Sequence, residues 1–188
     1  MRVVCYILLF VLMSFPSHGA PLSLPWGEEA QENIQDNLPK NFRYNYGSVS
    51  WGAMSFYGNL GDTSIPIELL LRFSNKRIKS AYLIISSDYL NEKNCLEEYK
   101  FILSHLKKKY GTQSTREIIK ESIYDDLLFE NHCYAIKVGV FQIIDKWKIN
   151  DFEIEAAIFS EDRGIFIEIH YIYIPMKQKS HINLEKSL

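Results

Sequence analysis

Two carboxylates and a histidine towards the C-terminal end are the side chains best suited to chemistry. Alternating apolar residues predict strands over residues 152–159 and 165–174, joined by a tight loop. Pairing their apolar faces sets Glu155 opposite His170 on the reverse face, with Glu168 beside them. Such a group could bind a divalent metal or form an acid–base pair.

The same residues also have a purely structural interpretation. Phe159 and Phe166 share that face, and an opposite-charge pair across two strands is a common stabilising contact. Metal sites usually group their ligands more tightly than this. A metal-dependent or acid–base hydrolase using Glu155, Glu168 and His170 is therefore the second hypothesis for the function.

Recognisable catalytic motifs are missing from the sequence. It has no Gly-x-Ser-x-Gly elbow, no glycine-rich phosphate loop and no His-Glu-x-x-His zinc motif. His132 precedes Cys133, but neighbouring side chains in a strand or helix diverge, which argues against a nucleophilic pair. We predict no catalytic residues and no cofactor, and we favour a protein that works by binding.

Aromatic residues near strand ends supply a candidate binding patch. Tyr171 and Tyr173 end the last predicted strand, and Trp51 lies in a segment expected to form an edge strand. Exposed Tyr and Trp provide large contact area at low entropic cost. The alternative is that these rings cover the rim of the core. The leading hypothesis is a non-catalytic module that binds an envelope or secreted protein, or a small ligand.

The first residues have the three-part pattern of a secretory signal peptide. Arg2 precedes an apolar run over residues 3–15, and small residues follow. That run is shorter than the roughly 20 apolar residues needed to span a bilayer. We expect cleavage after Gly19, which removes residues 1–19, or after Ala20. The remaining protein would have no membrane anchor and would be periplasmic or secreted.

Export bears on the cysteines, because disulfides persist outside the cytoplasm. Cys95 and Cys133 remain after cleavage and allow one intramolecular pairing. A bridge would close a loop of about 38 residues and stabilise the fold by about 4 kcal/mol in the chain-entropy model. The alternative is two buried thiols that pack as small apolar side chains.

Composition limits the classes of protein that remain. The chain has 188 residues, of which 47% are hydrophobic, and a formal charge of −2. This suits one cored domain, and it excludes whole-chain disorder and a polybasic nucleic-acid binder. We expect a single domain over residues 20–176, a mobile polar tail over residues 177–188, and no nucleic-acid partner.

One long helix and the strands around it must position the candidate groups. Apolar residues three or four apart predict an amphipathic helix over residues 92–110. A hairpin over residues 65–86 precedes it, and strands follow from residue 140. Residues 112–130 are expected to form an irregular connection. Residues 131–138 are too short for periodicity to decide between a short helix, which we favour, and the start of a strand. The prediction is an α+β fold, an antiparallel sheet of about five strands with the helix packed on one face.

Several short motifs follow one another along the chain. They are a Trp-Gly start at Trp26-Gly27, a hairpin around Asn75, a Lys-Tyr-Gly helix end at Lys109-Tyr110-Gly111, and a strand with Lys146-Trp147 followed by Ile154. Together they resemble a broad group of exported bacterial proteins without assigned function. The resemblance covers most of the mature chain. It implies a periplasmic or envelope setting and an α+β fold, and it supplies no catalytic residues.

Overall fold

A computed structural model describes most of the chain. The described residues are 21–30, 34–60, 63–86, 88–111, 115–120 and 132–175. The predicted signal peptide (1–19), the predicted tail (177–188) and most of the predicted connection (112–130) lie outside the described residues. The described part of that connection, Thr115–Lys120, forms a strand, so the prediction of an irregular segment is wrong there. Among the described residues, no helix combines the length and apolar character needed to cross a membrane.

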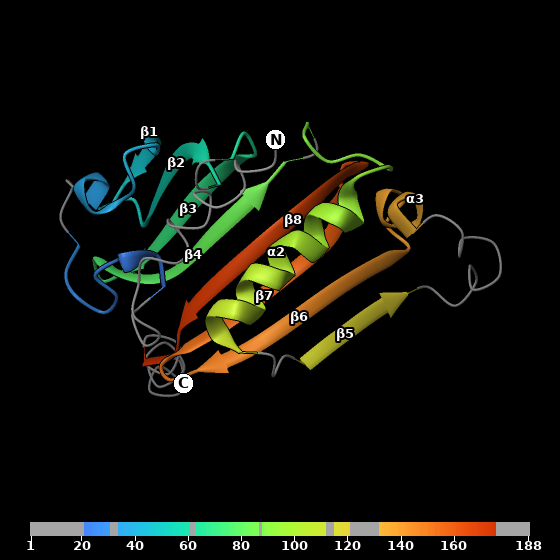
Figure 1. The fold of residues 1–188 in the computed structure, drawn as a ribbon. Helices are drawn as coiled ribbons and strands as arrows, with labels where there is room; N and C mark the ends of the chain where they lie inside the picture. The colour runs from blue at the N-terminus through green and yellow to red at the C-terminus, as the bar shows by residue number, and fades with distance from the viewer. Residues whose placement is uncertain are drawn as a thin grey trace, which may run out of the picture.

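The described residues form eight strands, which pair into one antiparallel sheet in the order β1-β2-β3-β4-β8-β7-β6-β5 (Figure 1). The strands are β1 (Arg43–Ser48), β2 (Ala53–Asn59), β3 (Pro66–Ser74), β4 (Arg77–Ile85), β5 (Thr115–Lys120), β6 (Phe141–Ile149), β7 (Phe152–Glu161) and β8 (Gly164–Tyr173). This order consists of two four-stranded meanders that meet where β4 pairs with β8. The last strand of the chain therefore lies in the middle of the sheet.

The predicted α+β fold, with about five strands and one long helix, is wrong. The described part is mostly β, with eight strands and two α-helices, α2 (Cys95–Tyr110) and α3 (His132–Lys137). The strands that the prediction omitted, β1 and β5, form the two edges of the sheet. Neither has a buried residue, and all six residues of β5 are exposed. Because an edge strand of this kind needs no alternating apolar residues, periodicity does not reveal it.

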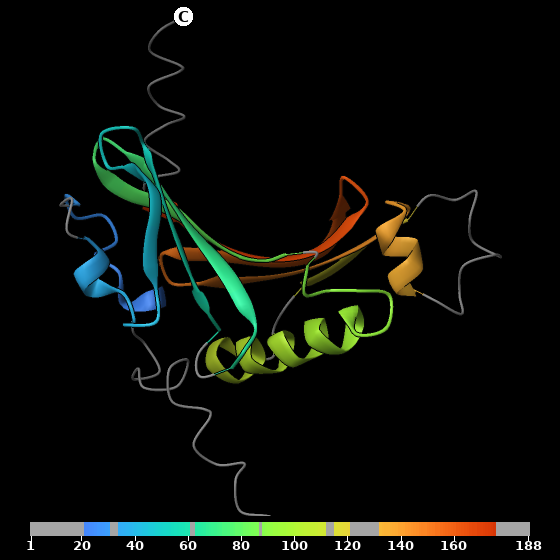
Figure 2. The same cartoon turned by 90° about the horizontal axis from the view of Figure 1, so that it is seen from above.

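Helix α2 packs across one face of the sheet, along β8, β7 and β6 (Figures 1 and 2). Its buried side chains are Cys95, Tyr99, Ile102, Leu103 and Leu106. They join one apolar cluster with alternate residues of the central strands, including the cross-strand pair Ile158 and Ile167. The helix predicted over residues 92–110 is confirmed and begins at Cys95. Its apolar stripe packs against the apolar face of the sheet.

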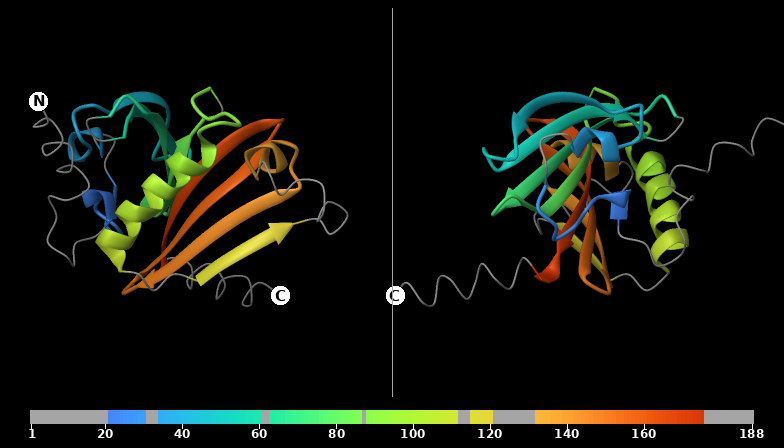
Figure 3. Two further views of the ribbon diagram at one scale, coloured as in Figure 1. Left: turned by 45° about the vertical axis from the view of Figure 1, so that its right-hand side comes forward. Right: turned by 90° about the vertical axis from the view of Figure 1, so that its left-hand side faces the viewer.

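The N-terminal segment packs against the same face, beside the C-terminal end of α2 (Figure 3). It contains two short 3₁₀ helices, η1 (Pro21–Ser23) and η2 (Ile34–Asn37). Buried apolar side chains attach it to the core, among them Leu24, Ile34 and Leu38. The N-terminal segment and α2 therefore cover this face together, and they lie next to each other on it.

Trp26 and Gly27 attach the beginning of the segment to the sheet. The Trp26 indole N–H donates a hydrogen bond to the Pro21 carbonyl at 2.7 Å, and its ring meets the Phe152 ring edge-on at 5.1 Å. Gly27 has a φ of +77°, and a Cβ there would lie 2.8 Å from the Tyr173 ring. Glycine is required at this position because both the backbone conformation and the close ring exclude a side chain.

The structure joins Cys95 and Cys133 in a disulfide, with 6.0 Å between their Cα atoms. This confirms the first of the two alternatives for the cysteines. Cys95 begins α2 and Cys133 lies in the first turn of α3, so the bridge connects the two helices. The short helix predicted over residues 131–138 is confirmed as α3. A helix of six residues is not stable in isolation, so packing and the cross-link to α2 must maintain it.

Candidate functional site

The face of the sheet turned away from α2, here called the reverse face, carries the predicted carboxylates and histidine. No helix in the described part covers it (Figures 2 and 3). Glu155 of β7 lies directly opposite His170 of β8, which confirms the predicted register. Glu168 lies two residues from His170 on the same face of β8, opposite Ala157. The structure therefore brings the three predicted residues onto one surface.

Two of these side chains, His170 and Glu155, also contact a neighbouring strand. The His170 ring stacks on the Tyr82 ring of β4, with 4.0 Å between centroids and 15° between planes. The Glu155 carboxylate lies 3.7 Å from the Lys146 ammonium of β6. The Arg72 guanidinium lies 5.3 Å from the centre of the Tyr82 ring. Contacts of this kind are usual on a solvated sheet face and stabilise strand pairing.

Glu168 is an acidic residue of the reverse face whose pKa is shifted from its ordinary value. Partial burial raises the pKa of Glu168, the Glu155 carboxylate raises it further, and Arg72 opposes both effects. Among the described residues, no group of three His, Cys, Asp or Glu side chains is arranged to hold a metal ion. The reverse face therefore has one perturbed acid and one stacked imidazole within a set of ordinary cross-strand contacts.

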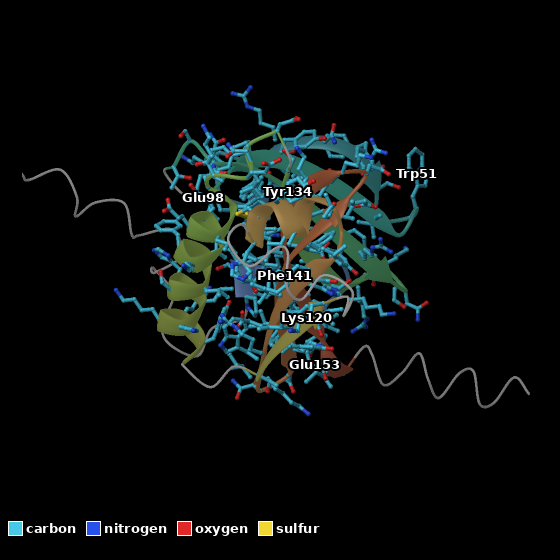
Figure 4. The ribbon with its side chains drawn as sticks, turned by 90° about the vertical axis from the view of Figure 1, so that its right-hand side faces the viewer. Trp51, Glu98, Lys120, Tyr134, Phe141 and Glu153 are labelled. Atoms are coloured by element: carbon cyan, nitrogen blue, oxygen red, sulfur yellow. A yellow bond between two sulfur atoms is a disulfide. The ribbon has the colours of Figure 1, made fainter. Side chains whose placement is uncertain are left out.

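The predicted aromatic patch of Trp51, Tyr171 and Tyr173 is wrong as a single surface. Trp51 lies in the turn between β1 and β2 with 81% of its surface exposed, and it projects outward (Figure 4). Tyr171 lies beneath α2 and is 1% exposed. Tyr173 packs against Trp26, with 6.3 Å between ring centres. The two tyrosines belong to the core and its rim because they fall on the face that α2 and the N-terminal segment cover.

A cavity that the sequence did not suggest lies between the N-terminal segment, the sheet and the last turn of α2. Its volume is about 300 Å³. We call it the α2 pocket. Its floor consists of six apolar side chains, each at most 9% exposed: Leu38, Phe42, Leu60, Ile67, Leu69 and Leu83. A cavity with a wholly apolar floor favours the apolar part of a ligand over water.

Separate segments of the chain build this floor. Leu69 of β3 lies directly opposite Leu83 of β4, and both point to the covered face because strand residues alternate. Leu60 directly follows β2. Phe42 is positioned by a turn in which its backbone N–H donates to the Pro39 carbonyl at 2.9 Å. The floor is therefore fixed by the sheet on one side and by the N-terminal segment on the other.

The rim of the α2 pocket is polar. Ser23, Asn37, Asn41 and Asn59 line it and are exposed. The Asn41 side-chain amide donates to the Asn59 carbonyl at 2.7 Å, which ties the segment to the end of β2. Leu22 and Ser23 have φ values of 59° and 51°, in the left-handed region that leucine rarely adopts. Strained backbone of this kind often occurs where a protein contacts a ligand.

Lys109 is the charged residue among the described residues that line the α2 pocket. It lies in the last turn of α2 and also lines a smaller cavity of about 20 Å³ between α2 and the sheet. Its ammonium lies 5.1 Å from the centre of the Tyr110 ring. Burial lowers the pKa of Lys109, because removal from water disfavours the charged form. The pocket thus combines an apolar floor with one partly buried cation.

Sequence reasoning missed this pocket for an identifiable reason. The triplet Lys107-Lys108-Lys109 lies in the last turn of α2, where the helix dipole favours cations, and this pattern in the sequence does not separate the three lysines. Lys108 is exposed, whereas Lys109 is partly buried and faces the cavity. The floor residues occupy ordinary core positions in the sequence, so no local motif marks them.

A second buried polar group lies under α2, away from the pocket. Asp145 of β6 is 1% exposed, and the Tyr99 hydroxyl lies 3.0 Å from its Oδ2 atom and 2.8 Å from the Ala156 carbonyl. Burial raises the pKa of Tyr99 well above its usual range, and the Asp145 charge adds to the effect. The tyrosine therefore remains a hydrogen-bond donor to the carboxylate, which is a structural role.

Comparison with known proteins found nothing similar. No family model matches the sequence, no curated protein matches it, and no solved structure matches the fold. What can be inferred about the function therefore comes from the geometry and chemistry of the α2 pocket.

Proposed function

We propose that this protein is an exported, non-catalytic binding module that holds a small apolar molecule in the α2 pocket. The observation that carries the proposal is a cavity of about 300 Å³ with a wholly apolar floor and a polar rim. Ligand sites typically have this construction, in which apolar surface supplies affinity and a few polar groups supply orientation.

The size of the pocket limits the ligand. A volume of about 300 Å³ corresponds to roughly ten water molecules of the liquid, and hence to a ligand with roughly ten non-hydrogen atoms inside the pocket. Affinity would come mainly from apolar area removed from water, at about 25 cal/mol per Å². A short alkyl chain or a single ring system meets both conditions.

The proposed location outside the cytoplasm is supported by the disulfide. Cys95 and Cys133 are both buried in the core, and a bridge of this kind persists in an oxidising compartment. The signal-peptide pattern over residues 1–19 and the bridge point to the same compartment from independent observations. A soluble carrier or sensor for an apolar molecule suits that setting.

The experiment is a fluorescence titration of the purified, oxidised protein with 1-naphthylamine, a fused two-ring compound that is uncharged at pH 7, has close to the roughly ten non-hydrogen atoms that the pocket allows, and changes its fluorescence when it leaves water. We expect saturable binding with one site per chain. Asn37→Trp, at the exposed rim, and Leu38→Trp, in the floor, should each weaken binding at least about ten-fold, which corresponds to about 1.4 kcal/mol.

Ile119→Trp is the matched control, because Ile119 is an exposed residue of β5 that does not line the pocket. It should bind the probe as the unmodified protein does. Asn37→Trp alters an exposed position and keeps the test independent of any folding defect in Leu38→Trp. Lack of saturable probe binding by the unmodified, folded protein would overturn the proposal.

A further inference from the structure

We propose that the ligand of the α2 pocket is an unbranched alkyl chain, the end of which passes from the pocket into the small cavity between α2 and the sheet. This inference rests on the proposed function and names the class of ligand. It is carried by two cavities that share part of their lining. Leu60, Leu83 and Lys109 line both the α2 pocket of about 300 Å³ and the small cavity of about 20 Å³.

The first step is the character of the small cavity. Most of its lining consists of buried side chains, five aliphatic and one aromatic, that are each at most 7% exposed: Leu60, Leu83, Ile102, Leu106, Ile169 and Tyr171. A volume of about 20 Å³ has room for one water-sized group. Because a cavity with apolar walls stays dry, a methyl or methylene group suits this space better than water does.

The second step is the boundary between the two cavities. Leu83 is held within the sheet, opposite Leu69 of β3 on one side and Ile169 of β8 on the other. Leu60 follows the end of β2, and its backbone N–H donates to the Ile65 carbonyl at 2.9 Å. A single file of methylene groups needs only a change of the Leu60 rotamer. A ring would also need Leu83 to move, which the paired strands oppose.

The third step is the direction in which the two cavities follow each other. Lys109, in the last turn of α2, lines both, whereas Ile102 and Leu106 line the small cavity from earlier turns. Ile102 and Lys109 are about 10 Å apart along the helix axis. The polar rim with Ser23 and Asn37 belongs to the α2 pocket and is exposed. A ligand that occupies both cavities is therefore extended along α2, with its polar end at the rim.

The test uses displacement of bound 1-naphthylamine by alcohols of increasing chain length. 1-Hexanol is shorter than the roughly ten non-hydrogen atoms that the α2 pocket allows, and 1-decanol is longer. In the unmodified protein we expect 1-decanol to displace the probe at an about ten-fold lower concentration than 1-octanol, because each methylene group removed from water contributes a factor of about four.

His105→Trp and Ile102→Phe each place a larger ring in the small cavity, and neither residue is among the described residues that line the α2 pocket. In both variants the difference between 1-octanol and 1-decanol should fall below about two-fold, because the end of the longer chain then stays in water. 1-Hexanol should displace the probe as it does from the unmodified protein. His105 is only partly buried, so His105→Trp keeps the test independent of a folding defect in Ile102→Phe.

Ser104→Trp is the matched control, because Ser104 is an exposed residue of α2 that lines neither cavity. It should retain the difference between the two alcohols. Decahydro-2-naphthol has as many carbon atoms as 1-decanol, in two fused rings, and cannot pass between Leu60 and Leu83. It should displace the probe equally from the unmodified protein and from His105→Trp.

Each result separates the inference from the function on which it rests. An unchanged difference between 1-octanol and 1-decanol in His105→Trp and Ile102→Phe would overturn the chain inference and leave the apolar site intact. Equal loss of the difference in Ser104→Trp would overturn it too, because the cause would then be a large side chain anywhere on the helix. Failure of the probe itself to bind would overturn the proposed function, and the inference with it.

Discussion

Arg116 on the edge strand β5 holds the buried carboxylate of Asp145 on β6 by both of its oxygens. Its Nε atom lies 3.2 Å from Oδ1 and from Oδ2, and its Nη2 atom lies 3.0 Å from Oδ2. The Asp145 side chain is 2% exposed, whereas that of Arg116 is 47% exposed. The arginine thus neutralises a core charge from the edge of the sheet, and it attaches to the core a strand that buries nothing itself.

Arg116→Met should lower the free energy of unfolding by about 2 kcal/mol, because it leaves a buried carboxylate without its cation. The expected loss is smaller than for a fully buried pair, since water can approach the vacated position. Adding Asp145→Leu should recover part of that loss, and urea unfolding of the single and double variants measures the coupling. Arg43→Met, at an exposed arginine of β1, should change stability by no more than about 0.5 kcal/mol. Simple additivity of the Arg116 and Asp145 effects would contradict this account.

Removal of the Cys95–Cys133 bridge should lower stability substantially. The two cysteines are 38 residues apart, and the chain-entropy model assigns about 4 kcal/mol to a loop of that length. Denaturant unfolding with and without a reductant measures the difference. The Cys95→Ala/Cys133→Ala double variant should be insensitive to the reductant, and an equal effect of the reductant on both proteins would show that it acts elsewhere.

Glu168 should make the stability of the protein depend on pH. Its pKa is raised above the ordinary value of 4.5, so the folded state binds the proton more tightly than the unfolded state. The contribution of this group is therefore fully present below pH 4.5 and is lost as the pH rises through the folded-state pKa. The side chain of Glu168→Gln does not titrate, so this variant does not lose stability in this way. Its free energy of unfolding, relative to that of the unmodified protein, should increase as the pH rises through this range. Parallel curves of unfolding free energy against pH would contradict the shift.

Tyr171 and Trp51 should differ sharply in their effect on stability. Tyr171→Ala empties a position that is 1% exposed, and we expect a loss of about 3 kcal/mol or more from the cavity and the lost burial. Trp51→Ala alters a side chain that is 81% exposed and should change the free energy of unfolding by no more than about 0.5 kcal/mol. Thermal and urea unfolding of both variants provide the test. A large effect of Trp51→Ala would show that the exposed ring has a structural role.

Part of the fold could be predicted because some segments bury one face completely. The β7–β8 hairpin has alternating isoleucines on both strands, and a shift by one residue would turn all of them to solvent, so the register was determined. The helix that became α2 has a continuous apolar stripe, which again allows one orientation. In these segments the pattern of burial is visible in the order of the residues.

The edge strands and the pocket could not be predicted for the opposite reason. β5 pairs along one side with β6, and its exposed residues Thr115 to Lys120 show no period of two. The floor of the α2 pocket combines Leu38, Leu60 and Leu83, each of which is an ordinary core residue in its own segment. Their convergence on one empty space depends on how the N-terminal segment and the sheet meet. That relationship is tertiary, and no local pattern encodes it.

The central position of β8 has a consequence for the time at which the sheet can be completed. β8 follows the other seven strands in the chain, yet it lies between β4 and β7. Because a chain is synthesised from its N-terminus, the β1–β4 meander is present first, with the edge of β4 open. Such an edge can recruit strands of other chains. The sheet cannot be completed until β8, which ends at Tyr173, is available to pair with β4. The chain is therefore most exposed to aggregation in the interval between the appearance of β4 and that of β8.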